Sequence, residues 1–175
     1  ELMRMNNATF ALIDPTRVTA PEYGRYSGFL FDSIYYLLAY SELVPTTLPG
    51  QALQHYTNSG AAQGKLPNSW FDANYYKSRW SDLTPLNLDN STLFQHYNLF
   101  GVWEGRSAGP KFDRFDGSRY LSENPDVAAY VDGNLPAFLG SRSNGAIAHF
   151  IIYGSSEQRV AYDASGVMID MGYVV

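Results

Sequence analysis

The three histidines of this chain are the residues that most invite a chemical role. Imidazole nitrogens bind zinc, and a zinc site needs three or four ligands at about 2.0–2.3 Å from one ion. Each histidine stands alone, without a second His at helical spacing, and the chain contains no cysteine. Equivalent positions in packed helical units lie on the order of 10 Å apart, which is too far for one ion. We therefore expect no metal at His55, His96 and His149.

The histidines occupy the same place in three copies of a sequence repeat. Each copy opens with Phe-Asp, has a tyrosine five positions after the phenylalanine, and closes on a related stretch: HYTNSGAAQGK, HYNLFGVWEGR or HFIIYGSSEQR. The opening phenylalanines, Phe31, Phe71 and Phe115, are 40 and 44 residues apart. A motif that recurs in this way is typical of stacked supersecondary units.

The triplication favours a structural role for the histidines. We expect each one to lie near the apolar side of the second helix of its repeat and to hydrogen-bond a neighbour in the same repeat. The first candidates for that neighbour are the acids that open the copies, with a backbone carbonyl as the alternative; these acids are Asp32, Asp72 and Asp116.

A second set of acids also recurs, and each repeat ends on a cation that can pair with it. Two carboxylates can perform acid–base catalysis, but an enzyme site is rarely triplicated within such a short array. We therefore predict structural salt bridges or helix caps. The expected pairs join Glu42, Asp82 and Asp126 to Lys65, Arg106 and Arg159.

The pattern of apolar residues predicts two helices in each repeat. The first covers about residues 31–43 in repeat 1, where Asp32 is placed to cap it, and Pro45 and Pro85 are expected to end the first helices of repeats 1 and 2. In repeat 3, Asn124-Pro125 predicts the start of a new short helix. The second helices are expected at about 51–59, 91–100 and 144–153, each closed by a left-handed glycine: Gly60, Gly101 and Gly154.

The predicted fold is mainly α, with three stacked helical hairpins in an α-solenoid-like array. We divide the chain into an N-terminal arm (1–28), repeat 1 (29–69), repeat 2 (70–112), repeat 3 (113–160) and a C-terminal extension (161–175). The turn signal Asp163–Gly166 allows a β-hairpin in the extension. Alternatively, Ile169-Asp170 opens a fourth repeat.

Composition excludes several classes of function. The net charge is −5 and the 12 basic residues are scattered, which argues against nucleic acid as a partner. No apolar run approaches 18 residues, so we expect no membrane span. The absence of cysteine excludes thiol catalysis, and the common hydrolase, metalloprotease and nucleotide-binding motifs do not occur.

The repeat resembles a tandem helical module of large secreted bacterial proteins, the calcium-binding RTX-type surface proteins and adhesins. The resemblance rests on FDxxYY near the start, YLSENPDVAAYV in repeat 3 and HYxxxGxxEGR at the end, and it covers about residues 31–159. Similar units flank some glycosyltransferases of polysaccharide synthesis. The resemblance implies a bacterial surface or secreted location and no catalytic role. Because the glycine-rich calcium-binding nonapeptides are absent, it implies no calcium site.

Residues that the repeats do not share are the candidates for binding. The insertion Val131–Gly145 belongs to repeat 3 alone, and insertions in arrays often lie on the binding face. Aromatic side chains can stack on sugars, and the alternative role for them is core packing. Trp103 lies in the loop after Gly101 and is the one most expected to be exposed. The candidate ligand-binding residues are Trp103, Asp132, Asn134, Arg142 and Asn144. A calcium loop from Asp132, Gly133, Asn134 and Asp163 is an alternative, although EF-hand spacing is missing.

These observations predict a non-catalytic module without a cofactor. We expect it to mediate adhesion, surface-layer or matrix attachment at the surface of a bacterium or outside it. Its expected partner is a surface polysaccharide or another surface protein. An alternative is an accessory domain of a polysaccharide-processing enzyme whose catalytic site lies elsewhere in the full chain.

Overall fold

The computed structural model describes residues 28–172, and it is mainly helical, which confirms the predicted class. The expected N-terminal arm lies outside the described residues except for Gly28. Each repeat contains short α-helices together with 3-10 or π-helical turns, which are labelled η. In chain order these are α3 (Ser33–Ala39), η1 (Ser41–Leu43), α4 (Pro49–His55), η2 (Tyr56–Gly60), α5 (Ala73–Arg79), η3 (Ser81–Leu86), α6 (Asn90–His96), η4 (Tyr97–Gly101), η5 (Pro110–Phe112), α7 (Gly117–Glu123), α8 (Pro125–Gly133), η6 (Leu135–Phe138), α9 (Arg142–His149) and η7 (Phe150–Gly154).

The first helices of repeats 1 and 2 end earlier than expected. They stop at Tyr40 in repeat 1 and at Trp80 in repeat 2, before Pro45 and Pro85, and a 3-10 turn follows. The break lets an aromatic side chain reach the segment that closes the repeat: the Tyr40 hydroxyl accepts from the Leu66 N–H, and the Trp80 Nε1–H donates to the Ser107 carbonyl. Tertiary contacts, rather than proline, therefore set this boundary.

Repeat 3 breaks at the corresponding place, as predicted. Asn124 separates α7 from α8, and Pro125 is the first residue of α8. The Asn124 side chain does not cap α8; its amide donates to the Tyr120 carbonyl and its oxygen accepts from Arg159. Repeat 3 thus gains a full helix where repeats 1 and 2 have a short turn.

Each second helix continues into a π-helical turn that starts directly after the histidine. Such wide turns are rare and usually occur singly inside α-helices. The glycine that ends each turn is not left-handed, so the expected C′ role of Gly60, Gly101 and Gly154 is wrong. The left-handed residue comes four positions later, and it is Gly64 (φ +78°), Gly105 (φ +67°) or Gln158 (φ +60°).

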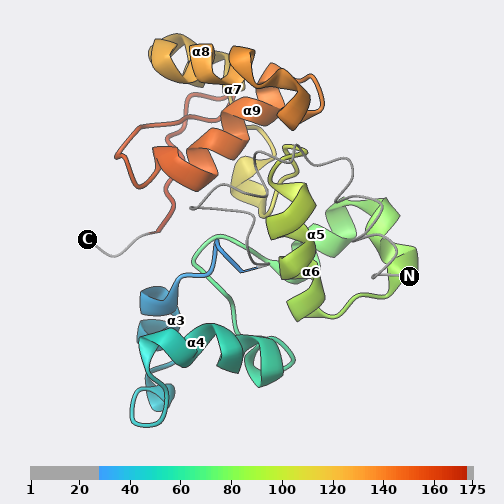
Figure 1. The fold of residues 1–175 in the computed structure, drawn as a ribbon, viewed down its shortest axis with the longest axis vertical. Helices are drawn as coiled ribbons and strands as arrows, with labels where there is room; N and C mark the ends of the chain where they lie inside the picture. The colour runs from blue at the N-terminus through green and yellow to red at the C-terminus, as the bar shows by residue number, and fades with distance from the viewer. Residues whose placement is uncertain (1–27, 173–175) are drawn as a thin grey trace.

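The helical hairpins are arranged around the segments that connect them (Figure 1). Extensive helix-to-helix contact lies within single repeats, as between α3 and α4, α5 and α6, or α7 and α9. The stacked, solenoid-like arrangement that we expected is therefore not confirmed. The Asp that opens each repeat instead donates its backbone N–H to the following connecting segment. The acceptors of Asp32, Asp72 and Asp116 are the carbonyls of Pro67 (3.0 Å), Ala108 (3.1 Å) and Tyr162 (2.9 Å).

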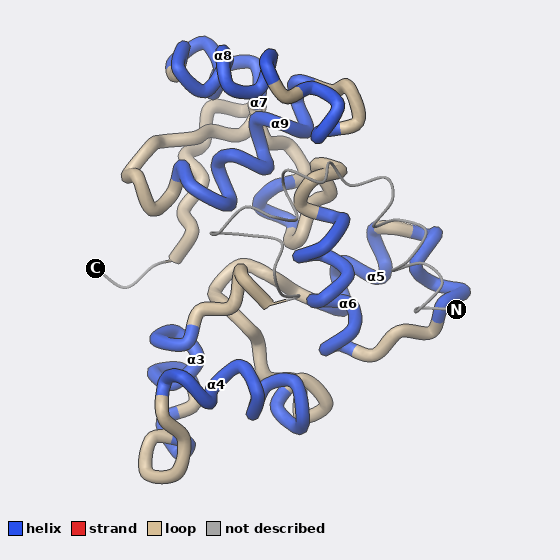
Figure 2. Tube along the Cα trace, in the orientation of Figure 1, coloured by secondary structure: helices blue, strands red, loops and turns tan. Residues whose placement is uncertain are grey.

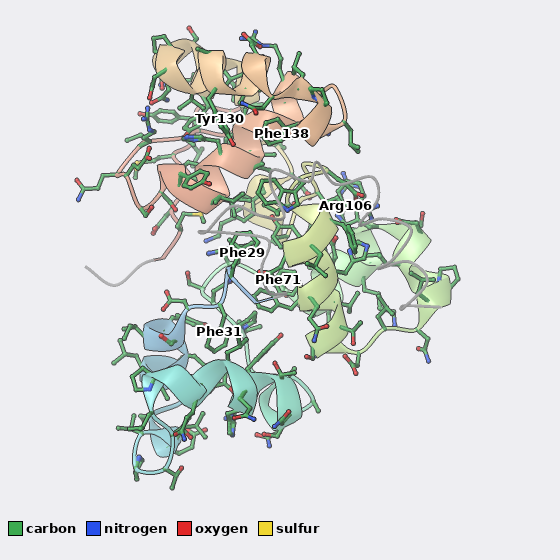
Figure 3. The ribbon with its side chains drawn as sticks, viewed as in Figure 1. Phe29, Phe31, Phe71, Arg106, Tyr130 and Phe138 are labelled. Atoms are coloured by element: carbon green, nitrogen blue, oxygen red, sulfur yellow. The ribbon has the colours of Figure 1, made fainter. Side chains whose placement is uncertain are left out.

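Aromatic rings form the core and cross from one repeat to the next. Phe71 packs against Tyr76, Phe94 and Tyr97 in repeat 2, with ring centroids 5.1–5.6 Å apart. Tyr56 of repeat 1 meets the same Phe94 edge-on at 5.6 Å. Phe29 and Phe71 lie between the helical units, in the middle of the molecule (Figure 3). The high tyrosine content thus serves packing.

A polar contact joins repeats 1 and 2 through the backbone of Leu30. The Leu30 N–H donates to Oδ1 of buried Asn98 (2.9 Å), and Nδ2 of buried Asn68 donates to the Leu30 carbonyl (3.0 Å). Asn98 belongs to repeat 2, and Asn68 to the segment that leads from repeat 1 into repeat 2. Both backbone groups of Leu30 are thus satisfied, one of them by a side chain of the next repeat.

The C-terminal extension forms a turn with two isolated antiparallel pairings, Tyr162 with Met168 and Phe115 with Asp163. No part of residues 28–172 is coloured as strand in the tube of Figure 2, so the hairpin alternative is present only in this reduced form. The fourth-repeat alternative falls partly on residues 173–175, outside the described part. Met171 is buried, and its carbonyl accepts from the Ser69 hydroxyl.

Within the described part of the chain, no helix has the length and apolar character that crossing a membrane requires.

Candidate functional site

Each histidine is hydrogen-bonded to the tyrosine of its own repeat. The Tyr hydroxyl and the His Nδ1 are 2.9 Å apart for Tyr36 and His55, 3.0 Å for Tyr76 and His96, and 3.0 Å for Tyr120 and His149. The prediction of a partner within the repeat is correct, but the proposed acids are wrong. The tyrosine lies one helical turn further along the first helix and faces the second helix, so its long side chain reaches the imidazole.

The three acids cap the first helices instead. Oδ1 of Asp32 accepts from the Tyr35 N–H (2.8 Å), Oδ1 of Asp72 from the Tyr75 N–H (3.0 Å), and Oδ1 of Asp116 from the Arg119 N–H (2.9 Å). A carboxylate in this place satisfies one of the free N–H groups of the first turn. The cap predicted for Asp32 is confirmed, and the same geometry recurs in the other two repeats.

A glycine lies against each tyrosine hydroxyl. A Cβ atom added at Gly60 would lie 2.0 Å from the Tyr36 oxygen, and one added at Gly101 or Gly154 would lie 2.2 Å from the oxygen of Tyr76 or Tyr120. These separations are far below van der Waals contact. The recurring glycine therefore makes room for the Tyr–His pair rather than supplying a left-handed helix end.

Burial favours the neutral form of the imidazoles of His96 and His149. Desolvation lowers the pKa of His96 to about 4 and lowers that of His149, because each imidazole is surrounded by aromatic rings. Burial raises the pKa of the Tyr36 hydroxyl to about 12 and raises that of Tyr76 further. The Tyr–His pairs of repeats 2 and 3 are buried and packed against a glycine, so their geometry suits a structural bond rather than acid–base chemistry.

The predicted salt bridges are present in all three repeats. Lys65 contacts Glu42 at 2.6 Å, and the guanidinium groups of Arg106 and Arg159 each bind both oxygens of one carboxylate, Asp82 at 2.9–3.0 Å and Asp126 at 2.6–3.0 Å. The cation also holds the pKa of Asp82 and Asp126 below the usual range, through the hydrogen bonds it donates. Each of these carboxylates is ionised and bound by a cation. The ion pair joins the segment after the first helix to the end of the same repeat.

The guanidinium of Arg106 makes two further contacts besides the ion pair with Asp82. Its Nε–H also donates to Glu104, and the group lies 4.9 Å from the centre of the Trp80 ring. Figure 3 places Arg106 beside the helices of repeat 2. Lys65 lies in the same way over Tyr40, at 4.2 Å.

Trp103 is not the exposed platform that we expected. Only 8% of its surface is accessible, and its ring stacks on Phe29 of repeat 1 at 6.2 Å. Its Nε1–H donates to the Asn98 carbonyl (3.2 Å). The loop position suggested exposure, but the packing of the connecting segments around this loop buries the indole.

The other candidate binding residues lie in or beside repeat 3, and only two of them form a cluster. Arg142 binds both oxygens of Asp132 at 2.7 and 3.1 Å, and both side chains are exposed. Asn134 donates to the Tyr130 carbonyl (2.7 Å) and Asn144 to the Phe138 carbonyl (3.2 Å). These amides hold the insertion in place through backbone carbonyls of Tyr130, which precedes it, and Phe138, which belongs to it; Figure 3 labels both residues.

The alternative calcium loop does not assemble. Asp132 faces Arg142, whereas Oδ1 of Asp163 accepts from the backbone N–H groups of Ser165 (2.8 Å) and Val167 (2.9 Å). Among residues 28–172, no cluster of three or more His, Asp or Glu side chains is placed to hold a metal ion.

Sequence reasoning missed a set of exposed apolar side chains in repeat 1. Ile34, Leu38 and Leu48 are 60%, 61% and 67% exposed. The signal was available in the aligned copies, because repeats 2 and 3 carry polar residues at these positions. The equivalents of Ile34 and Leu38 are Asn74 and Ser78 in repeat 2, and Ser118 and Ser122 in repeat 3.

Comparison with known proteins adds no assignment: the chain matches no protein-family model, no curated protein and no solved structure.

Proposed function

We propose that this chain is a non-catalytic module of a bacterial cell-surface or secreted protein that mediates adhesion, surface-layer or matrix attachment through protein or glycan contacts. One observation carries the proposal: the polar groups that recur in every repeat are used in internal contacts. The histidines bind tyrosines, the opening acids cap helices, and the second acids pair with cations. The side chains left to contact a partner are the exposed residues that the repeats do not share.

The exposed Asp132–Arg142 pair is the best candidate for a glycan contact. It presents a planar carboxylate and a planar guanidinium side by side on the insertion of repeat 3. Charged and amide groups of this kind hydrogen-bond sugar hydroxyls, and their exposure leaves lone pairs and N–H groups accessible.

Isothermal titration against the surface polysaccharide of the producing bacterium tests this proposal. We expect the Asp132→Ala/Arg142→Ala variant to bind at least about tenfold more weakly than the unchanged protein. The matched control is Arg119→Ala/Glu123→Ala, which removes another exposed ion pair of repeat 3. Absence of heat with every surface glycan would leave protein contacts as the mode of attachment, and cleavage of the polysaccharide during the titration would contradict a non-catalytic role.

A further inference from the structure

A partly open pocket lies between repeats 1 and 2 and is lined by side chains of both. Its volume is about 110 Å³. One water molecule needs roughly 10–15 Å³, and pockets for drug-sized ligands have roughly 300–1,000 Å³, so this pocket has room for one small ring. Repeat 1 lines it from α4 and η2, and repeat 2 lines it from α6, with Leu53, Tyr56, Thr57, Ser91, Phe94 and Gln95.

Two hydroxyl groups at this pocket have no partner within the protein. Tyr56 and Ser91 are only 1% and 9% exposed, and neither hydroxyl is hydrogen-bonded within residues 28–172. Burial raises the pKa of Tyr56, so its hydroxyl keeps its proton and can donate as well as accept. Buried polar groups are nearly always hydrogen-bonded. A partner for these two has to enter through the pocket.

The corresponding place between repeats 2 and 3 is closed. Counted from the histidines, Ser91 of repeat 2 corresponds to Asn144 of repeat 3. Asn144 packs so closely against repeat 2 that a Cβ atom added at Gly105 would lie 2.8 Å from its Cα. A Cβ atom added at Gly64, the equivalent of Gly105 in repeat 1, would meet no atom of the described residues within 4 Å. The opening is therefore a property of the boundary between repeats 1 and 2.

We propose that this pocket binds one neutral sugar unit, the terminal residue of a glycan. None of the lining residues in the described chain is charged, which disfavours an ionic ligand, because a buried charge needs a partner. The hydroxyls of Tyr56 and Ser91 and the half-buried amide of Gln95 both donate and accept hydrogen bonds, as sugar hydroxyls do. Phe94 and Leu53 supply apolar surface for the C–H groups of the ring.

This inference rests on the proposed attachment role and deepens it, because it names the class of ligand and a site separate from the Asp132–Arg142 pair. NMR titration of the ¹⁵N-labelled full chain with D-glucose, D-galactose and D-mannose tests it. We expect at least one of these sugars to bind with a dissociation constant on the order of 1 mM, since a single ring makes few contacts. The amide signals of Tyr56, Ser91 and Gln95 should shift during the titration.

Removal of single hydroxyls identifies the groups that bind. We expect Tyr56→Phe and Ser91→Ala each to weaken sugar binding about threefold, and the double variant to weaken it at least about tenfold. Repeat 3 has Phe150 at the position of Tyr56, so the fold accepts phenylalanine there. The matched control is Tyr97→Phe in repeat 2. It removes the equivalent hydroxyl, which is buried away from the pocket, and should leave sugar binding unchanged.

Four results would overturn the inference. The first is the absence of any shift at the pocket with all three sugars up to about 100 mM. The second is equal weakening by Tyr97→Phe and Tyr56→Phe. The third is equally strong binding of cyclohexanol, which would show that the pocket does not recognise hydroxyl groups. The fourth is tighter binding of N-acetylserinamide than of any sugar, which would assign the pocket to a protein partner.

Titration with the surface polysaccharide separates this inference from the attachment role. Polysaccharide binding that survives Tyr56→Phe/Ser91→Ala, in a protein that binds no monosaccharide, would overturn the inference and leave the attachment role intact. Monosaccharide binding at the pocket without heat from the polysaccharide would support the pocket and contradict attachment through a glycan.

Discussion

The hydroxyl of Tyr36 lies where a Cβ atom at position 60 would have to be, 2.0 Å away. We therefore expect Gly60→Ala to lower the free energy of unfolding by about 1–3 kcal/mol, because a packed core does not accept an extra methyl group without displacement. Urea denaturation followed by circular dichroism measures this change. The matched control is Gly50→Ala in α4, where an added Cβ meets nothing within 4 Å; alanine should be neutral or stabilising there.

The Tyr36→Phe/Gly60→Ala double variant identifies the cause. Without the hydroxyl, the atom closest to the added Cβ is Cζ of the ring at 3.2 Å, so the added methyl group needs only a small displacement. We expect the cost of Gly60→Ala to shrink clearly in the Tyr36→Phe background. An equal cost in both backgrounds would show that backbone conformation, and not the hydroxyl, requires glycine.

His96 makes stability depend on pH. Its pKa falls from 6.5 to about 4 in the folded protein, so the unfolded chain binds the proton more readily. The stabilisation is complete above pH 6.5 and is lost as pH falls towards 4, with a total of up to about 3 kcal/mol. The pKa of His149 is also lowered by burial, which adds to the effect.

Urea denaturation between pH 7.5 and 4.5 checks this prediction. We expect the stability difference between the unchanged protein and His96→Gln to become smaller as pH falls, since glutamine does not titrate. A difference that stays constant over this range would rule out His96 as a source of the pH dependence.

At the level of helices, repeat 1 lacks a cap that repeats 2 and 3 possess. Asp89 and Ser141 precede α6 and α9, and their side chains accept from Thr92 and Asn144 N–H groups. Leu48 occupies this place before α4, with the same extended backbone (φ −76°, ψ 156°) but no side-chain acceptor. We expect Leu48→Asp to raise the free energy of unfolding by about 1 kcal/mol.

Thermal and urea denaturation measure this gain. Leu48→Asn should give a similar increase and Leu48→Ala none, because only an oxygen acceptor can cap. Equal stability of all three variants would contradict the capping explanation.

The periodic pattern predicted the existence of the helices, the capping by Asp32 and the acid–cation pairs, since these depend on residues close in sequence or on charges that must pair. It did not predict the π turns or the end of the first helix at Tyr40 and Trp80. Those features arise from side chains that contact other segments, and local propensity contains no information about such contacts. The predicted exposure of Trp103 was wrong for the same reason, because the burial of its ring depends on Phe29 of another repeat.

Across the whole molecule, the repeats are joined by connecting segments, and Asn98 is central to one such junction. We expect Asn98→Ala to lower the free energy of unfolding by about 1–3 kcal/mol, because the Leu30 N–H loses its partner while it is partly buried. Asn58→Ala is the control, since Asn58 is exposed and its replacement should change stability by less than about 0.5 kcal/mol. Hydrogen exchange should rise first in repeat 1; a uniform rise in all repeats would contradict a local junction.

The close approach of glycine and tyrosine also restricts how such a repeat can diverge. Any side chain at Gly60, Gly101 or Gly154 collides with a hydroxyl oxygen, and replacement of the tyrosine by phenylalanine removes that collision. At position 101 an added Cβ would still lie 2.8 Å from Cδ2 of Tyr97. Substitutions at the two positions are therefore ordered: the hydroxyl must be lost before the glycine can change. A lineage in which the glycine changed first would pass through a destabilised protein, so related repeats should show alanine at the glycine position together with a residue other than tyrosine at its partner.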